Sequence, residues 1–426
     1  MGDGSSPLKA LMNQGVRRRT VLKAGLAAGA VQLASPFIIS ARAEQPIKMG
    51  FNDPLTGTYA ALGKNEQHGC EYAIEQMNKK GGILGRPVEL LVEDSTSGDV
   101  GTAVQKARKL IDRDKVDFLL GNVNSAMALA LGQVSNEAKK FHVVTGGHTD
   151  AVTGKDCHWN VFRVCNTTQM EANAVASSLI KSGKKWYYVT PDYAFGHTLQ
   201  AGLEKACTKL GGSKAGGDLV PLGTTDFSSY LIKAQGASPD VIIFLMAGDD
   251  MVNALKQAVQ FGLDKRFHIA GAQQELEVLE GLPPEALIGT WVFEWYWKQP
   301  NVPHVAEFVE GIRKKTGKVP TARTWFGYVS AWTCALVANQ EKTLDAVKLA
   351  RAMQDFALPP EIALMPHKAF YRAGQNQLMP TLYVGKARPH PAGGDKEDLF
   401  EVNELVNGAE AAGPVEESGC KLSWPA

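Results

Sequence analysis

The sequence predicts an α/β protein built from two doubly wound, parallel-sheet lobes that are joined by three hinge crossings. From residue 44 onward, short β-branched and aromatic runs alternate with helical patterns, which is typical of βαβ units and a parallel sheet. This alternation occurs twice, before and after the strand-like segment 159–164. The chain has 426 residues, and the 383 that follow a predicted 43-residue leader exceed what one hydrophobic core usually serves.

The first copy of the alternation supplies most of the first lobe. Its strands end in turn-forming residues, and Gly81-Gly82 closes the first helix with the usual glycine stop. We predict strands over 47–51, 88–93, 116–120 and 141–145, and helices over 66–78, 100–113 and 126–139.

The second copy supplies the second lobe, and the chain then returns to the first. We predict strands over 186–189, 215–220, 240–246 and 267–271, and helices over 169–181, 197–210, 226–234 and 251–260. The aromatic segment 291–296 crosses back and is followed by helices over 305–316, 325–340 and 344–356. The third crossing is a hairpin made by 370–371 and 378–384.

These elements divide the chain into four parts. The first lobe is expected to comprise 44–163 and 294–372, and the second lobe 164–293 and 373–396. The remaining parts are the leader over 1–43 and a surface tail over 397–426, which is rich in Gly, Pro and Glu.

The leader has the features of a twin-arginine export signal. Arg18 and Arg19 open the arginine pattern, and the apolar run 24–39 is short for a membrane-spanning helix. Residues 41–43 form a small-x-small cleavage site, which disfavours the alternative of an uncleaved anchor. We therefore predict export across a bacterial inner membrane, cleavage after Ala43, and a periplasmic mature protein that begins at Glu44.

Charge and motifs exclude several classes of function. The whole chain has a net charge of +1, and the leader contributes six basic residues and one acidic residue, so the mature protein has a net charge of −4. A mildly acidic chain without a basic block argues against nucleic acid or anionic lipid as a partner. The mature chain lacks the common nucleotide, hydrolase and metalloprotease motifs, and its histidines show no ligand spacing. We expect neither an enzyme nor a metal or cofactor, and a sensory ectodomain is disfavoured because no transmembrane or signalling segment follows.

Six cysteines occur without a C-x-x-C pair, so a thiolate metal site or redox motif is not expected. Cys70, Cys207 and Cys334 fall within helical patterns and are expected to be buried. Cys157 lies in a polar loop and Cys420 in the tail, and export permits disulfides. We predict a Cys157–Cys420 bridge that ties down the tail.

The segment 184–196 is the clearest strand–loop–helix unit in the chain. Its strand ends at Pro191, and Asp192, Tyr193 and Phe195 follow. In open α/β sheets, ligands bind just outside the carboxyl ends of the strands. These three residues therefore stand where a ligand is expected, although both rings can instead pack the loop.

Sequence motifs along the mature chain resemble those of the leucine/isoleucine/valine-binding family, the periplasmic solute-binding proteins of ATP-driven importers. The motifs are IKMGFNDPLTG from residue 47, AIEQMNKKGGILGRPVEL from 73, VDFLLG from 116, DYAFG from 192, TTDFSSYL from 224 and LKQAVQFGL from 255. The resemblance implies a type I periplasmic binding fold, whose lobes close on a small molecule and present it to an ABC permease in the inner membrane. It also implies a monomer.

The resemblance implies that the first lobe holds a ligand carboxylate with two loops. Ser125 matches the first hydroxyl of the family site and follows Asn124 at a predicted helix N-terminus, which favours an anion. Thr149 matches the second hydroxyl and follows Gly147 and His148. Ser125 can equally be a helix cap, and His148, where the family has a small residue, can narrow the site or donate to the ligand.

The second half of the family site is less well matched. The acid that binds a ligand ammonium falls near Gln273, where we expect no acid, and an aromatic position falls at Ala247. Another aromatic position falls at Leu62, with Tyr59 three residues earlier, and Phe195 lacks the family's hydroxyl. Asp192, Asp249 or Asp250 can replace the missing acid or be a cap or solvated charge, and Arg323 can bind a carboxylate or be structural.

Two ligand classes remain open on these residues. The first is an amino acid, of the branched-chain type, with a rearranged ammonium site. The second is an aromatic or aliphatic carboxylic acid, or an amide, that lacks an ammonium and stacks on Tyr193 or Phe195.

Overall fold

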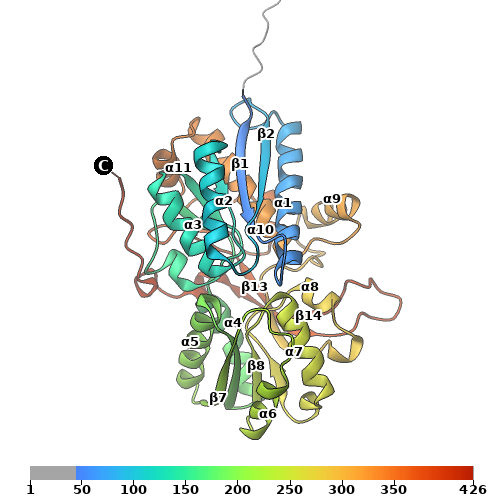
Figure 1. The fold of residues 1–426 in the computed structure, drawn as a ribbon. Coiled ribbons are helices and arrows are strands. Elements are labelled where there is room, and N and C mark those ends of the chain that lie inside the picture. The colour runs from blue at the N-terminus through green and yellow to red at the C-terminus, as the bar shows by residue number, and fades with distance from the viewer. Residues whose placement is uncertain (1–44, 426) are drawn as a thin grey trace, which may run out of the picture. The chain divides into compact units, whose positions relative to one another are not determined.

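The computed structural model describes residues 45–425, drawn in colour in Figure 1. Within this range the chain forms two seven-stranded sheets with helices packed on them. The predicted fold class, two α/β lobes with mainly parallel sheets, is confirmed. The predicted export signal over 1–43 and its cleavage after Ala43 lie outside the described residues.

The first sheet has the two hallmarks of a doubly wound sheet, parallel pairing and a reversal of strand order. Its strands are β1 (Ile47–Asp53), β2 (Val88–Asp94), β3 (Phe118–Leu120), β4 (Phe141–Val144), β5 (Val161–Arg163), β11 (Phe370–Arg372) and β12 (Gln377–Met379). Their order is β11-β12-β5-β4-β3-β1-β2. Neighbouring strands are parallel except β11 and β12, which are antiparallel. The order reverses between β1 and β3, which is the position where such sheets bind ligands.

The second sheet repeats this layout. Its strands are β6 (Lys185–Pro191), β7 (Ser213–Val220), β8 (Val241–Phe244), β9 (His268–Ala270), β10 (Thr290–Phe293), β13 (Thr381–Ala387) and β14 (Phe400–Asn407). Their order is β14-β13-β10-β9-β8-β6-β7, and β13 pairs antiparallel with both β10 and β14. The reversal between β6 and β8 places a second ligand-binding edge in this lobe.

Helices connect the strands in both lobes. Those of the first lobe are α1 (Ala60–Lys79), α2 (Val100–Arg108), α3 (Ser125–Glu137), α9 (Val305–Thr316), α10 (Ala322–Glu341), α11 (Ala346–Ala352) and α12 (Pro360–Ala363). Those of the second lobe are α4 (Thr168–Ser182), α5 (Ala194–Lys209), α6 (Ser228–Gly236), α7 (Gly248–Gln260), α8 (Leu276–Glu280) and α13 (Gly408–Ala412). Several begin earlier than predicted, so Phe195 lies in the first turn of α5 rather than in the preceding loop.

Helix α10 is buried along almost its whole length, and its backbone lies directly against that of α1. A Cβ atom on Gly69 would lie 2.0 Å from the carbonyl oxygen of Thr324, and one on Gly327 would lie 1.8 Å from that of Glu66. Glycine is therefore required at both positions. The close approach brings Glu66 on α1 beside Arg323 on α10.

The chain crosses between the sheets after β5, after β10, and between β12 and β13. Two predicted boundaries were wrong. The hairpin is formed by β11 and β12 within the first sheet, because Pro380 lacks the N–H that would continue the ladder and β13 joins the other sheet. The predicted tail 397–426 contains β14, whose Phe400 ring packs 4.2 Å from that of Phe293, so this segment extends the second lobe.

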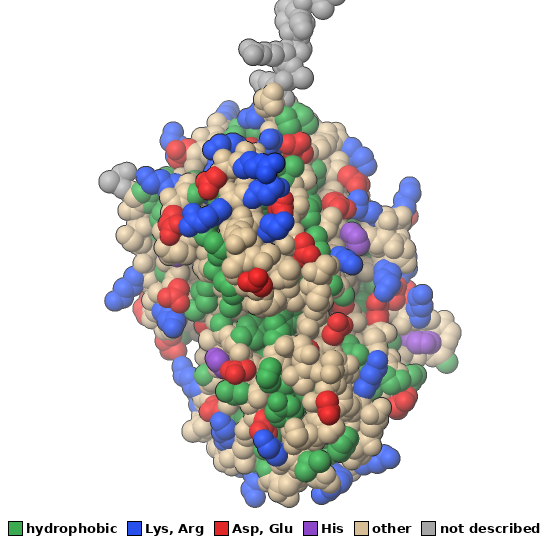
Figure 2. Space-filling model, in the orientation of Figure 1, with side chains coloured by type: hydrophobic (Ala, Val, Ile, Leu, Met, Phe, Trp, Pro, Cys, Tyr) green, Lys and Arg blue, Asp and Glu red, His purple; other side chains and the backbone are tan. Residues whose placement is uncertain are grey.

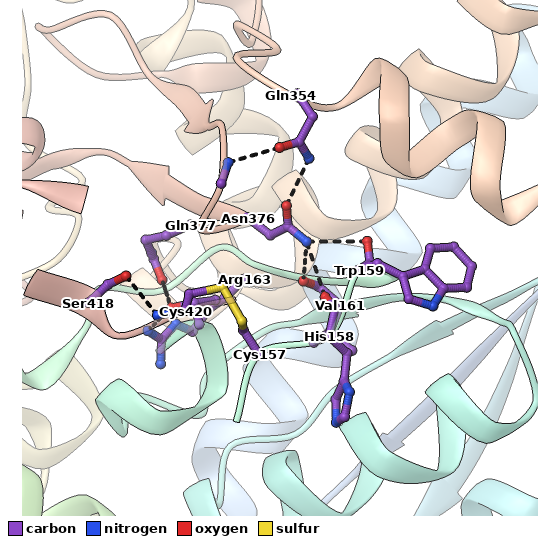
Figure 3. The surroundings of a disulfide bond; sticks show 12 residues. Cys157, His158, Trp159, Val161, Arg163, Gln354, Asn376, Gln377, Ser418 and Cys420 are labelled. Atoms are coloured by element: carbon purple, nitrogen blue, oxygen red, sulfur yellow. Dashed lines mark hydrogen bonds between the residues drawn. A yellow bond between two sulfur atoms is a disulfide. The ribbon is translucent and has the colours of Figure 1, made fainter. Parts of the chain in front are cut away.

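A disulfide bond between Cys157 and Cys420 anchors the remaining tail, as the sequence predicted (Figure 3). The tail also brings the Trp424 ring to 6.2 Å from that of Trp159. Beside the bridge, the Asn376 amide donates to the backbone carbonyls of residues 158, 159 and 161 at 3.2–3.3 Å. The C-terminal segment is therefore fastened to the first lobe next to its third crossing.

The surface drawn in Figure 2 mixes acidic, basic and hydrophobic side chains, with several Lys and Arg side chains gathered over the first lobe. Among the helices of residues 45–425, we find none that combines the length and the apolar character needed to cross a membrane.

Candidate ligand-binding site between the lobes

The edges of the two sheets at which a ligand is expected are in contact with each other. Tyr59, at the N-terminus of α1, and Tyr193, at the N-terminus of α5, join their hydroxyl groups at 2.7 Å. Ala247 and Val123 pack in the same small hydrophobic cluster as Tyr59. The predicted residues Tyr59, Tyr193 and Ala247 thus lie together where the lobes meet.

The two loops expected to hold a carboxylate are bound to each other. The Ser125 hydroxyl oxygen accepts a hydrogen bond from the Thr149 backbone N–H at 3.1 Å. The cap of α3 is Asn124, whose side chain accepts from the N–H groups of Ala126 and Met127, so the alternative of Ser125 as the cap was wrong. The Ser125 and Thr149 hydroxyls serve as acceptors in the described contacts, which leaves their protons available to a ligand.

Arg163, at the end of β5, fixes the shape of the second loop. Its guanidinium donates to the carbonyl oxygens of Gly147 at 3.0 Å and Thr149 at 2.6 Å, and to the Gln377 side chain at 2.6 Å. Gly147 in turn packs on α3, where a Cβ atom would lie 2.5 Å from that of Ala128. The binding loop is thereby attached to the strands that carry the first and third crossings.

Arg323 joins the lobes through two buried carboxylates. Its Nε donates to Glu275 Oε1 of the second lobe at 2.9 Å, and its Nη1 donates to Glu66 Oε1 of the first lobe at 3.1 Å. Burial by itself would lower the pKa of Arg323, but the charges of Glu275 and Glu66 outweigh it and hold that pKa well above its usual value. Burial, and then the charge of Glu66, raise the pKa of the nearby Asp53 well above its usual range.

His148 is the centre of a second buried group across the lobes. Its Nε2 contacts Glu294 Oε1 within hydrogen-bond distance, lies 3.6 Å from Glu171 Oε1, and lies 3.3 Å from Gln273 Nε2. The ring of Phe195, one of the predicted residues, lies 5.8 Å from the His148 ring, and that of Phe326 lies 6.1 Å away. Gln273 and Phe195 therefore contact His148 directly.

Two predicted residues lie outside this layer. The Asp192 side chain is about half exposed and pairs with His197 at 2.9 Å, and Asp249 is exposed in the first turn of α7. The structure does not bring either carboxylate to the buried layer, because both side chains lie at the protein surface. Asp250 is buried but accepts from the Gly223 N–H at 2.9 Å, within its own lobe.

The expectation of no acid near Gln273 was wrong, since Glu275 stands two residues later and is buried. Sequence reasoning also missed Glu66, Glu171 and Glu294. Glu171 and Glu294 are single acids among mainly apolar neighbours, and Glu294 in particular interrupts the run Trp-Val-Phe-Glu-Trp-Tyr-Trp, whereas Glu66 lies in the polar stretch Lys-Asn-Glu-Gln-His. A lone acid among apolar neighbours is the signal that could have identified Glu171 and Glu294.

Glu277 on α8 adds a pH-sensitive contact between the lobes. Its Oε1 accepts from Asn65 on α1 at 2.7 Å and from Thr321 at the N-cap of α10 at 2.6 Å. Burial, and then the charge of Glu275, raise the pKa of Glu277 to about 7. The folded protein thus binds more protons than the unfolded chain between that value and the ordinary glutamate pKa of about 4.3.

We therefore expect Glu277 to make the protein less stable as the pH rises from about 4.3 to about 7. Glu277→Gln should remove this pH dependence. Between pH 5 and pH 8, the free energy of unfolding should therefore fall by up to about 3 kcal/mol less in the variant than in the wild type. Urea denaturation of both proteins at the two pH values measures the difference. Parallel pH profiles would contradict the assignment.

Comparisons with known proteins match the chain across both lobes. Residues 46–395 match the family model described as periplasmic binding protein. The Leu/Ile/Val-binding protein homolog 7 of Brucella suis biovar 1 (strain 1330) is 27% identical over 341 residues, which cover 76% of this chain and 84% of that protein.

Solved structures show the same similarity. A periplasmic binding protein from Burkholderia mallei superposes with a TM-score of 0.82 at 26% identity, covering 88% of this chain and 98% of that one. An amino acid ABC transporter substrate-binding protein from Pseudomonas fluorescens Pf-5 superposes with a TM-score of 0.79 at 28% identity, covering 89% and 100%.

Proposed function

Because this chain belongs to the periplasmic binding protein family, we propose that it is an exported receptor that captures a small carboxylate-bearing solute between its lobes. The closed receptor then delivers the solute to an ABC permease in the inner membrane. The protein acts as a monomer and does not convert its solute.

The observation that carries the proposal is the buried layer in which polar groups of both lobes meet. Two pairs join the first lobe to the second: Tyr59 with Tyr193, and Arg323 with Glu275. A third pair, His148 with Glu294, joins the first lobe to the crossing that follows β10. Opening the lobes would separate the first two pairs. A solute that contacts both sides favours the closed form by the difference in its affinity for the two forms.

The first-lobe side of this layer suits a carboxylate. Ser125 and Thr149 present hydroxyl groups at the N-terminus of α3, and Arg163 holds the loop that carries Thr149. A hydrogen bond from a neutral donor to a charged acceptor contributes about 1.5–3 kcal/mol when it replaces contact with water. The carboxylate is therefore assigned to this side.

An amino acid is the first candidate solute, because buried acids outnumber buried arginines around the site. The acids are Asp53, Glu66, Glu171, Glu275 and Glu294, and the arginines are Arg163 and Arg323. A positively charged group on the solute would offset the excess. An aromatic acid is the second candidate, because the rings of Phe195 and Phe326 flank His148.

Calorimetric titration tests the function and separates these candidates. The protein is freed of bound molecules by unfolding and refolding, and is then titrated with leucine, benzoate and acetamide. We expect saturable binding of a carboxylate, with thermal stabilisation and no product formed. Binding of acetamide alone, or turnover of any of the three, would contradict the proposal.

Loss of the two hydroxyl groups should weaken solute binding without unfolding the protein. We expect Ser125→Ala and Thr149→Ala each to lower affinity about 10-fold or more, since each removes a donor to a charged group. Thr208→Ala, which removes an exposed hydroxyl on α5, is the matched control. Unchanged affinity in both site variants, by calorimetry, would remove the carboxylate assignment.

Export should depend on the arginine pair of the leader. Replacing Arg18 and Arg19 by lysines is expected to leave the full-length precursor in the cytoplasm, because the twin-arginine signal is read by a receptor. Cell fractionation and mass measurement of the periplasmic form test this, with Arg42→Lys as the control. A mature periplasmic protein that begins at Glu44 in the double variant would refute twin-arginine export.

A further inference from the structure

His148, Glu171 and Glu294 form a buried triad that is separate from the Ser125 and Thr149 hydroxyls assigned to the solute carboxylate. One ligand atom from each lies within 4.8 Å of the other two, and His148 Nε2 is 3.6 Å from Glu171 Oε1. Their side chains are at most 3% exposed. The members come from three separate segments: the loop after β4, helix α4, and the crossing that follows β10.

The hydrogen bond between His148 and Glu294 accounts for only part of this triad. Glu294 also accepts from the Asn166 N–H at 2.7 Å through its other oxygen. Glu171 is fully buried, yet neither of its carboxylate oxygens has a hydrogen-bond partner among the described residues. A buried, ionised carboxylate without a hydrogen-bond partner is costly, and a bound cation would remove that cost.

Gln273 gives a second, independent sign of a ligand at the triad. Its Nε2 lies 3.3 Å from His148 Nε2 and 3.5 Å from Glu294 Oε1, while its Oε1 is buried without a partner. The terminal amide torsion of glutamine is roughly two-fold, so its nitrogen and oxygen can exchange places by a half-turn. Turning the Gln273 amide would place its Oε1 beside the triad, where this oxygen would coordinate a bound cation.

We propose that His148, Glu171 and Glu294 bind a divalent cation of the zinc type, which bridges the two lobes. One imidazole nitrogen and two carboxylates are a ligand set that zinc uses, whereas calcium and magnesium prefer oxygen ligands alone. Four-coordinate zinc places its ligands about 2 Å from the metal and so about 3.3 Å from one another, close to the His148–Glu171 separation.

The surroundings of the triad fit this assignment. The Asn166 N–H orients the Glu294 carboxylate, as outer-sphere hydrogen bonds do in metal sites. The rings of Phe195 and Phe326 flank His148 and exclude water from it. Three protein ligands leave a fourth position for Gln273.

Binding of the cation should favour closure of the two lobes. His148 belongs to the first lobe and Glu171 to the second, so a cation held by both would join the two lobes. A bound cation would therefore stabilise the closed form, and it would also supply the positive charge that the surrounding acids require.

Metal analysis of the full-length protein, expressed and purified without a polyhistidine tag, tests the proposal. After dialysis against EDTA, we expect calorimetry to show one zinc ion bound per chain, and Co²⁺ to give the absorption bands of a four-coordinate site. Glu171→Gln and His148→Gln should each weaken zinc binding at least about 100-fold. Glu307→Gln, an exposed acid beside His304, is the matched control and should bind zinc as wild type does.

Circular dichroism confirms that each variant is folded before its affinity is compared. The proposal is overturned if the folded wild type binds no zinc, or if Glu171→Gln binds it as tightly as wild type. It is also overturned if an amino acid binds the metal-free wild type and binds Glu171→Gln more weakly, because the triad then binds the ammonium group of the solute. Each of these three results leaves the receptor function standing, because solute titration measures that function separately.

Discussion

Arg323→Met should destabilise the protein by about 3–5 kcal/mol, because it leaves the buried carboxylates of Glu66 and Glu275 without their partner. The methionine fills much of the same volume and keeps the helix propensity of α10, so the loss isolates the charge. Urea denaturation measures the change in the free energy of unfolding.

A rescue variant separates this explanation from simple loss of packing. When Arg323→Met is combined with Glu66→Gln and Glu275→Gln, the uncompensated charges disappear, and we expect most of the lost stability to return. A triple variant no more stable than the single one would show that Arg323 acts through packing. If the free energy of unfolding of Arg323→Met lies within about 0.5 kcal/mol of the wild-type value, the two ion pairs of Arg323 have no central role in stability.

Removing the disulfide is expected to have the second-largest effect on stability. The Cys157–Cys420 bond joins residues 263 positions apart and fastens the C-terminal segment to the first lobe. Removing a native disulfide typically costs about 2–5 kcal/mol, and the cost rises with the length of the closed loop. The double variant Cys157→Ser with Cys420→Ser should therefore lower the melting temperature by several degrees.

Reduction supplies the control for this prediction. Dithiothreitol should lower the melting temperature of the wild type to that of the double variant and leave the variant unchanged. The four other cysteines are buried and unpaired, so they do not complicate the comparison. A double variant that melts with the wild type would show that the tail is held by its packing, including that of Trp424, rather than by the bond.

The strand–helix alternation was enough to predict the two lobes and most of their elements, because each strand and helix carries its own periodic pattern. Sheet membership was harder. Phe400 and Val402, with the acid Glu401 between them, belong to an amphipathic edge strand, but the Gly, Pro and Glu around them suggested a tail. Pro380 separates two strands of different sheets, which a local pattern cannot reveal.

The residues of the candidate site show the same difference between local signals and contacts that only the fold creates. Ser125, His148 and Thr149 follow strand ends and were predicted from that position and from the resemblance. Glu171 and Glu294 lie in a helix and a crossing whose neighbours are apolar, and only the three-dimensional fold brings them to His148. Glu294 is more than 100 residues from His148 along the chain, and no local signal records such a contact.

Small-angle X-ray scattering tests the central claim, that one solute is held by both lobes and closes them. The refolded, solute-free protein is measured with and without saturating amounts of the solute that calorimetry identifies. We predict that the radius of gyration falls on binding, and that the fall is lost in the Ser125→Ala and Thr149→Ala double variant at the same solute concentration. Saturable binding with an unchanged radius of gyration would contradict the account.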